Sequence, residues 1–160
     1  MRFGAITTTR RNHAVEHGTV GILLSRHSPA PLGGLATPFG FLVVGKISGP
    51  ETADAAEEAL GRLRAGENSL AVSPYCGTNL VIGAMIAGGV AALATRRSTR
   101  RLRHVRAAAL GMFAAALLRG AVGNEVQRRL TTLAEVGELE VRSVRSLPLG
   151  GYYIHFVRTS

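Results

Sequence analysis

NSLAVSPYCGTNLVIGAMIAGGVAALAT, residues 68–95, is a run of 28 residues without one charged side chain. Its most apolar part is Leu80–Ala94. Within that part, Gly88 and Ala92 have the small-xxx-small spacing that lets two helices approach closely. The run therefore predicts an apolar helix that begins near Thr78.

A second apolar run, Ala107–Leu118, follows and continues to Asn124 with one interruption at Arg119. A helix needs roughly 20 apolar residues to cross a bilayer, and Arg119 fits such a span if it snorkels to the interface. We therefore expect a transmembrane hairpin over residues 78–95 and 105–124. The alternative is a soluble bundle with two buried Ala/Gly-rich helices.

Between the two runs lies an arginine cluster, Arg96–Arg106, with six Arg, one His and no acidic residue. This cluster accounts for much of the net charge of +9. It has no interleaved aromatic residues to stack on bases, so it does not suggest nucleic acid as a partner. Because apolar runs flank it, we expect it to contact the anionic headgroups of a lipid bilayer.

The expected location is the plasma (inner) membrane. The positive-inside rule would place the arginine cluster in the cytoplasm and export both flanking segments. The N-terminal 77 residues carry no signal-like apolar run that would help such export. We therefore favour a soluble domain on the cytoplasmic side, and the sequence leaves a homo-oligomer open.

The segments outside the hairpin alternate between helix and strand signals. Residues 9–25 have helical periodicity, with Thr8 or Thr9 as the expected N-cap. Residues 27–38 hold three Pro and two Gly and predict a loop. Residues 39–47 are rich in β-branched and aromatic side chains and predict a strand.

A second helix follows, because Ser48 and Glu51 have capping-box spacing and Gly66 is suited to the position after its end. Three further strands are expected in the segments that remain: residues 69–73, 139–145 and 152–158.

The fold class that follows is α+β: a small mixed α/β domain with an inserted two-helix transmembrane hairpin. Residues 1–77 form its N-terminal half, residues 78–124 the hairpin, and residues 125–160 a β-hairpin that completes the domain. An even number of membrane crossings keeps both halves on one side, as this arrangement requires.

The chemistry is concentrated in His13-Ala14-Val15-Glu16-His17, within the first predicted helix. Residues four apart lie on one face of a helix, so both imidazoles can bind one divalent metal ion. Glu16 reaches the same face, as a further ligand or as a general base on a water molecule. H-x-x-E-H is also the signature of inverzincin peptidases, although two histidines on a helix often only form hydrogen bonds.

Cys76 is the single cysteine, which excludes an intramolecular disulfide. It stands just before the first apolar helix, which we expect Thr78 or Asn79 to cap. A helix N-terminus favours thiolate, so Cys76 can complete a zinc site with the two histidines or act as a nucleophile. It can also be a small buried residue at a tight turn. His27, His104 and His155 are weaker candidates, and His155 is expected to be a structural, hydrogen-bonding residue.

Together, Arg11–His17, Cys76–Asn79 and Gln127–Thr132 resemble an uncharacterised bacterial family of small membrane proteins with R-N-H-A-x-E-H and C-G-T-N motifs. The chain is more distantly similar to the YqhQ family, described as predicted metal-dependent enzymes. Two departures from the YqhQ pattern are Val15 in place of Ala, and Ser73–Tyr75 in place of an H-P-R run, which removes one candidate ligand.

These observations lead to one hypothesis. His13, His17 and Cys76 bind Zn²⁺ at the membrane interface, and Glu16 is the catalytic base of a hydrolase-like site. The alternatives are a non-enzymatic scaffold or assembly module in which the cluster is structural, and a Cys–His thiol enzyme. The substrate, the metal and the question of catalysis itself are left open by the sequence.

Overall fold

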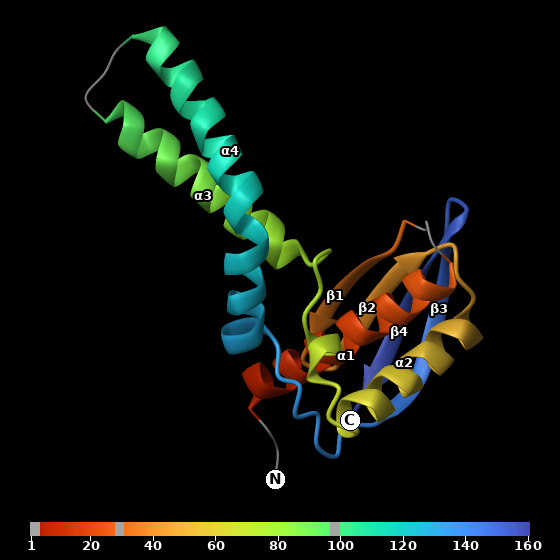
Figure 1. The fold of residues 1–160 in the computed structure, drawn as a ribbon. Coiled ribbons are helices and arrows are strands. Elements are labelled where there is room, and N and C mark those ends of the chain that lie inside the picture. Colours follow the sequence, from red (N-terminus) through yellow and green to blue (C-terminus); the bar gives the residue numbers. More distant parts are fainter. Residues whose placement is uncertain (1–3, 28–30, 97–99) are drawn as a thin grey trace. The chain divides into compact units, whose positions relative to one another are not determined.

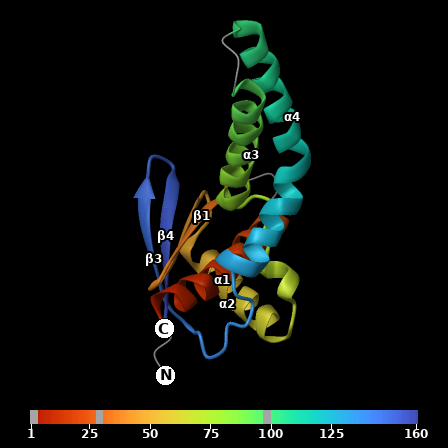
Figure 2. The same cartoon turned by 90° about the vertical axis from the view of Figure 1, so that its left-hand side faces the viewer.

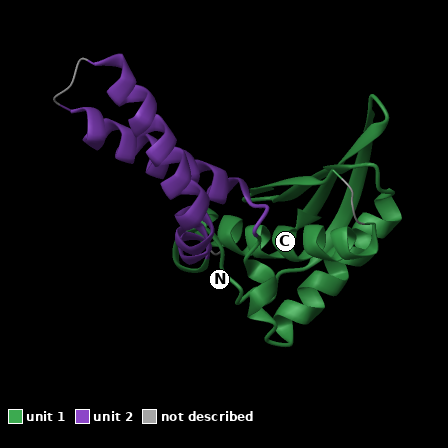
Figure 3. Cartoon of the chain, turned by 45° about the horizontal axis from the view of Figure 1, so that its top comes forward, with its two compact units in different colours: residues 1–73, 128–160 green, residues 74–127 purple. Residues whose placement is uncertain are grey.

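The chain forms two compact units, residues 1–73 with 128–160 and residues 74–127 (Figure 3). The computed structural model describes residues 4–27, 31–96 and 100–160. The first unit combines helices with a four-stranded antiparallel sheet, and the second contains two long apolar helices that form a hairpin. The predicted α+β fold class is therefore confirmed.

The first unit is a two-layer structure in which two helices cover one face of the sheet (Figures 1 and 2). The strand order is β1-β2-β4-β3, and every neighbouring pair is antiparallel. The described elements are α1 (Ala5–Arg26), β1 (Gly33–Thr37), β2 (Gly40–Gly45), α2 (Gly49–Arg64), the 3₁₀ turn η1 (Asn68–Ala71), β3 (Val141–Leu149) and β4 (Tyr152–Thr159).

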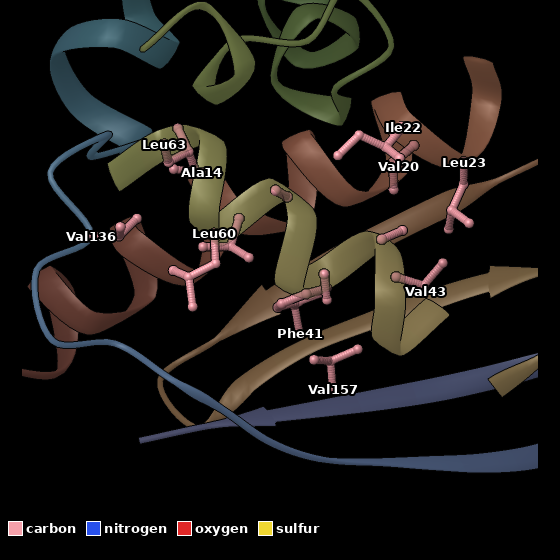
Figure 4. Packing of buried hydrophobic residues seen from close by; sticks show 14 of the residues in the cluster. Ala14, Val20, Ile22, Leu23, Phe41, Val43, Leu60, Leu63, Val136 and Val157 are labelled. Atoms are coloured by element: carbon pink, nitrogen blue, oxygen red, sulfur yellow. The ribbon is translucent and has the colours of Figure 1, made fainter. Parts of the chain in front are cut away.

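The core lies between these two layers (Figure 4). Phe41, Val43 and Val157 point from the sheet toward the helices and are fully buried. The two helices approach closely at Gly18, where an added Cβ would lie 2.9 Å from the Cβ of Ala59. Small residues at this crossing let α1 and α2 pack closely side by side on the sheet, and ten residues of α1 are buried.

The boundaries of α2 follow the sequence signals. Ser48 and Glu51 form the predicted capping box, and Gly66 adopts a φ of +92° just after the helix. His27 also bonds Glu51, with Nε2 2.7 Å from Oε1. The pKa of Glu51 is lowered first by this bond and then by the bonds from Ser48.

Three local expectations were wrong. Part of the predicted loop over residues 27–38 is strand β1, which adds an edge to the sheet beside β2; residues 28–30 lie outside the described part. The predicted strand over residues 69–73 is instead η1, whose Ala71 carbonyl accepts a hydrogen bond from α1. Helix α1 begins at Ala5 with Gly4 as N-cap, and the hydroxyl of Thr9 bonds the Ala5 carbonyl inside the helix.

The second unit consists of α3 (Gly77–Thr95) and α4 (Arg101–Val126), with the π-helical turn η2 (Gln127–Thr131) directly after them. The helices approach closely at Gly111, where an added Cβ would collide with the Ala87 carbonyl oxygen, and at Gly123, where it would collide with Oδ1 of Asn79. Gly88 was expected at the contact, yet it has open space around its Cβ position. The contact therefore uses small residues of α4 rather than the predicted pair.

Two helical stretches, Gly77–Thr95 and Arg101–Thr131, are long and apolar enough to cross a membrane. Their mean hydropathies are 1.7 and 1.5. In the most apolar 18 residues of each stretch, only 11% and 17% of the residues are buried. Low burial distinguishes both from the core helix of a soluble domain. Of the arginine cluster between them, residues 97–99 lie outside the described residues.

Candidate metal centre

His13 and His17 lie one turn apart on α1, as the sequence predicted. Their ring centroids are 4.3 Å apart and the rings meet edge to face at 62°. His17 is 4% exposed, and His13 is half-buried. The pair thus faces the interior of the protein rather than solvent.

Both rings have the same hydrogen-bonding arrangement. Nδ1 of His13 lies 2.9 Å from the carbonyl oxygen of Thr131, and Nδ1 of His17 lies 2.8 Å from that of Ala71. A carbonyl oxygen only accepts, so each Nδ1 must carry the proton and donate. In a neutral ring this hydrogen bond leaves the lone pair on Nε2, which is the form in which histidine binds a metal.

The Nε2 atom of His17 is buried and has no hydrogen-bond partner among the residues that the structure describes. A buried polar atom left in this way costs roughly 1–3 kcal/mol. The Nε2 atom of His13 lies 3.7 Å from Oε2 of Glu16, three residues further along the helix. A buried carboxylate therefore lies beside the histidine pair.

Strand β1 positions the carboxylate of Glu16. The side chain of Glu16 is 8% exposed. A Cβ added at Gly34 would lie 2.0 Å from its Oε1 atom. Only glycine at position 34 leaves room for the carboxylate where it is.

Cys76 is the N-cap of α3, which corrects the expectation that Thr78 or Asn79 caps this helix. Its sulfur accepts a hydrogen bond of 3.4 Å from the backbone N–H of Thr78. A sulfur that accepts from the first turn of a helix is in a setting that favours thiolate.

Cys76 lies shortly after η1, the segment that bonds His17. It follows Ala71, whose carbonyl bonds His17, by five residues, which span at most about 18 Å. Ligand atoms of His13, His17 and Cys76 all lie within 4.8 Å of one another. These three residues form a group that is compatible with metal binding.

The other histidines have different surroundings. His155 is fully buried in β4, and both of its ring nitrogens have partners, Ser146 and the Ile47 carbonyl. This confirms its predicted structural role. His27 pairs with Glu51 at the surface, and Nδ1 of the exposed His104 bonds the Arg100 carbonyl within α4.

Three groups that shape the centre could not be recognised as such from sequence. They are the carbonyls of Ala71 and Thr131 and the Cβ-free surface of Gly34. A carbonyl carries no residue-specific signal. The Gln127–Thr132 motif did single out the segment that contains Thr131. Gly34, in contrast, lies in the segment that the sequence predicted to be a loop.

The molecule is thus an α+β protein with an apolar helical hairpin and a His/His/Cys group compatible with metal binding. Residues 8–144 match the family described as a domain of unknown function, DUF6391, and the chain belongs to this family. It is also 33% identical over 162 residues to an uncharacterised protein of Picosynechococcus sp., covering 93% of this chain and 78% of that protein. No solved structure matches the chain.

Proposed function

We propose that this protein is a membrane-anchored, metal-dependent enzyme of the hydrolase type. His13, His17 and Cys76 bind one zinc ion, and Glu16 is the general base. The single observation that carries the proposal is the shared hydrogen bonding of the two histidines: each Nδ1 donates to a main-chain carbonyl, which in the neutral rings places the lone pair on Nε2.

The donor set fits zinc in kind and in size. Two imidazole nitrogens and one thiolate, with a fourth position for water or substrate, are the ligand set of a catalytic rather than a structural site. Tetrahedral zinc needs ligand atoms roughly 3.3–3.6 Å apart. The candidate ligand atoms lie within 4.8 Å of one another, which is compatible with their binding one ion.

Glu16 has the position that a base requires. Its carboxylate lies beside Nε2 of His13 and is held against Gly34, so it can accept a proton from a water molecule next to the ligands. Zinc in such a site supplies Lewis acidity. The resemblance of the motifs to the YqhQ family suggests the same class of chemistry.

The membrane part of the proposal rests on the two apolar helical stretches. They would cross the plasma membrane as a hairpin, with the arginines of residues 96–106 at anionic headgroups and the α+β unit on the cytoplasmic side. In an alkaline carbonate wash, the full chain should stay in the membrane pellet. Complete release into the supernatant would contradict the proposed span.

A structural role is the rival function, and one observation favours it. The Nδ1 bonds of His13 and His17 connect α1 to segments 118 and 54 residues away along the chain. Such bonds alone would justify two buried histidines in a non-enzymatic scaffold. Under this reading the cluster contributes stability and binds no metal.

Metal content separates the two functions. The full chain, purified in detergent and dialysed against trace zinc, should hold about one zinc ion per chain. His17→Ala should lose it, and His27→Ala, which removes an exposed histidine elsewhere in the same unit, should keep it. If wild type and His17→Ala hold the same small amount of metal and differ only in stability, the scaffold is correct.

Two further variants test the roles within the site. In cobalt-loaded protein, Cys76→Ser should remove the near-ultraviolet sulfur-to-cobalt absorption, because that band requires a thiolate ligand. Glu16→Gln should keep the metal and lose hydrolysis of an activated ester or peptide. A cobalt spectrum that Cys76→Ser leaves unchanged would exclude the sulfur as a ligand.

A further inference from the structure

The charges of the α+β unit are divided between its two layers. The strand segments, residues 31–47 and 141–160, contain no Asp or Glu but four cationic residues: Lys46, Arg142, Arg145 and Arg158. Arg142 forms an ion pair of 3.0 Å with Glu140, just before β3, so the positive charge of this layer comes mainly from the other three. Helix α2 carries four acidic residues in its first ten positions, residues 49–58. The sheet layer is therefore positive, and acidic charge is concentrated in the helical layer.

The face of the sheet opposite the helices is apolar. Strand register places Leu35, Leu42 and Phe156 in one row across three strands, with Arg145 at its end. The next row contains Val44, Ile154 and Leu147. Leu35 and Leu147 are 61% and 66% exposed, and α1 and α2 lie on the other side of the sheet (Figure 2).

A pocket of about 220 Å³ opens on this face near the end of β4. It is lined by Phe39, Ser143, Arg145, Phe156 and Arg158. Two guanidinium groups and a hydroxyl are donors suited to a phosphate group, and the two phenyl rings offer an apolar wall beside them. This combination fits a molecule that carries a phosphate next to hydrocarbon.

We propose that the open sheet face is a docking surface for an anionic membrane leaflet, with the pocket receiving a phospholipid headgroup. The aliphatic rows contact the boundary between headgroups and acyl chains, and Arg145 and Arg158 bind the phosphate. This surface is separate from the metal centre, so the inference rests on the membrane part of the proposed function and not on its metal chemistry.

Charge decides between the leaflet and other occupants. A second copy docked on the same face would bring Arg145 and Arg158 of both chains together, with no acidic residue in the strand segments to neutralise them. Single-stranded nucleic acid would use stacking aromatic residues, whereas the two central rows are mainly aliphatic. An anionic lipid surface satisfies both the positive charge and the aliphatic character.

The chain contains no Trp, so one introduced Trp can report on this face. The full-length Leu147→Trp variant is reconstituted in phosphatidylcholine vesicles, with or without phosphatidylglycerol, that contain lipids brominated on the acyl chains. Glu57→Trp, on the exposed face of α2, is the matched control. We expect strong bromine quenching of Leu147→Trp in phosphatidylglycerol vesicles and little quenching of Glu57→Trp.

Adding Arg145→Gln and Arg158→Gln to Leu147→Trp should weaken docking roughly 25-fold, about fivefold per arginine. Arg26→Gln with Arg62→Gln removes the same charge from the helical layer and should have little effect. Equal quenching of Leu147→Trp and Glu57→Trp would overturn the proposal. The proposal would also be overturned if the Trp of Leu147→Trp is shielded from water but not quenched by bromine and the chains crosslink through this face. The occupant would then be a second copy of the chain.

Discussion

Two places in the α+β unit bury histidine side chains, and they differ in how many ring nitrogens are satisfied. His155 is fully buried, and both of its nitrogens have partners, at 2.7 Å and 2.9 Å. His17 is almost as buried, but only its Nδ1 has a partner among the described residues. Burial alone therefore does not separate a structural histidine from a candidate ligand, whereas the unused nitrogen does.

The same difference makes His17, and not His155, a candidate metal ligand. A protein gains nothing in stability from a buried nitrogen without a partner, so such an atom calls for another reason. A metal ion on Nε2 would satisfy it and would use the tautomer that the Ala71 carbonyl enforces. His155 offers no such free position.

The largest expected effect is the loss of zinc from His17→Ala. We expect the zinc affinity to fall by more than about 100-fold, since even an outer-shell partner is worth 10–100-fold. His155→Ala should keep the wild-type affinity and lose about 3 kcal/mol of stability, because it leaves a cavity and an unpaired Ile47 carbonyl. Isothermal titration with zinc and chemical unfolding measure the two quantities. Equal loss of zinc affinity in both variants would remove the distinction.

Added zinc should stabilise the protein only in variants that keep both His13 and His17. At a free zinc concentration 100 times the dissociation constant, linkage predicts about 2.7 kcal/mol of added stability. His155→Ala should gain the same free energy of unfolding from zinc, although its stability without zinc is lower. His17→Ala should gain none. Thermal unfolding with zinc and then with excess chelator tests this. An increment that persists in His17→Ala would place the zinc elsewhere.

Gly34→Ala should displace the carboxylate of Glu16 rather than the histidines. The added methyl would collide with Oε1, the far end of a flexible side chain, so the Glu16 side chain should shift at a cost of less than about 1 kcal/mol. We expect catalysis to be lost while zinc is retained. Gly33→Ala, which meets nothing within 4 Å, is the matched control and should stay within about 0.5 kcal/mol of wild type. Wild-type hydrolysis by Gly34→Ala would argue against Glu16 as the base.

The exposed His27 extends the comparison to a histidine at the surface and predicts the smallest effect. The pKa of Glu51 is lowered from its ordinary value of 4.5, first by the bond to His27. A carboxylate with a lowered folded pKa stabilises the protein above the unfolded pKa, and this stabilisation disappears as pH falls through the folded pKa. His27→Ala should therefore lose less stability than wild type when the pH is lowered from 6 to 3, as thermal unfolding would show. An unchanged acid dependence would mean that this contact is not formed in solution.

Much of the fold could be predicted from the sequence because its signals are local. The capping box at Ser48 and Glu51, the glycine at position 66 and the strand pattern of β2 all specify their own segments. The two errors in the sheet came from segments with weak local signals. Gly33–Thr37 becomes a strand because β2 offers a pairing edge, and Asn68–Ala71 becomes a 3₁₀ turn that bonds His17.

The metal centre shows the same difference between local sequence signals and contacts made by the tertiary fold. Helical spacing was sufficient to pair His13 with His17, and the pairing is confirmed. The roles of His13, His17, Cys76 and Glu16 as zinc ligands and base remain predictions. The tautomers and the position of Glu16 depend on main-chain carbonyls and on Gly34, which come from distant parts of the chain. Such contacts follow from the tertiary fold and not from any local pattern.

The most direct test of the shared centre is X-ray absorption spectroscopy of the zinc-loaded full chain. We predict a first shell with two imidazole nitrogens at about 2.0 Å and one sulfur at about 2.3 Å. Cys76→Ser should remove the sulfur and leave the imidazole pattern. A shell of oxygen atoms alone, with neither sulfur nor imidazole, would contradict the account.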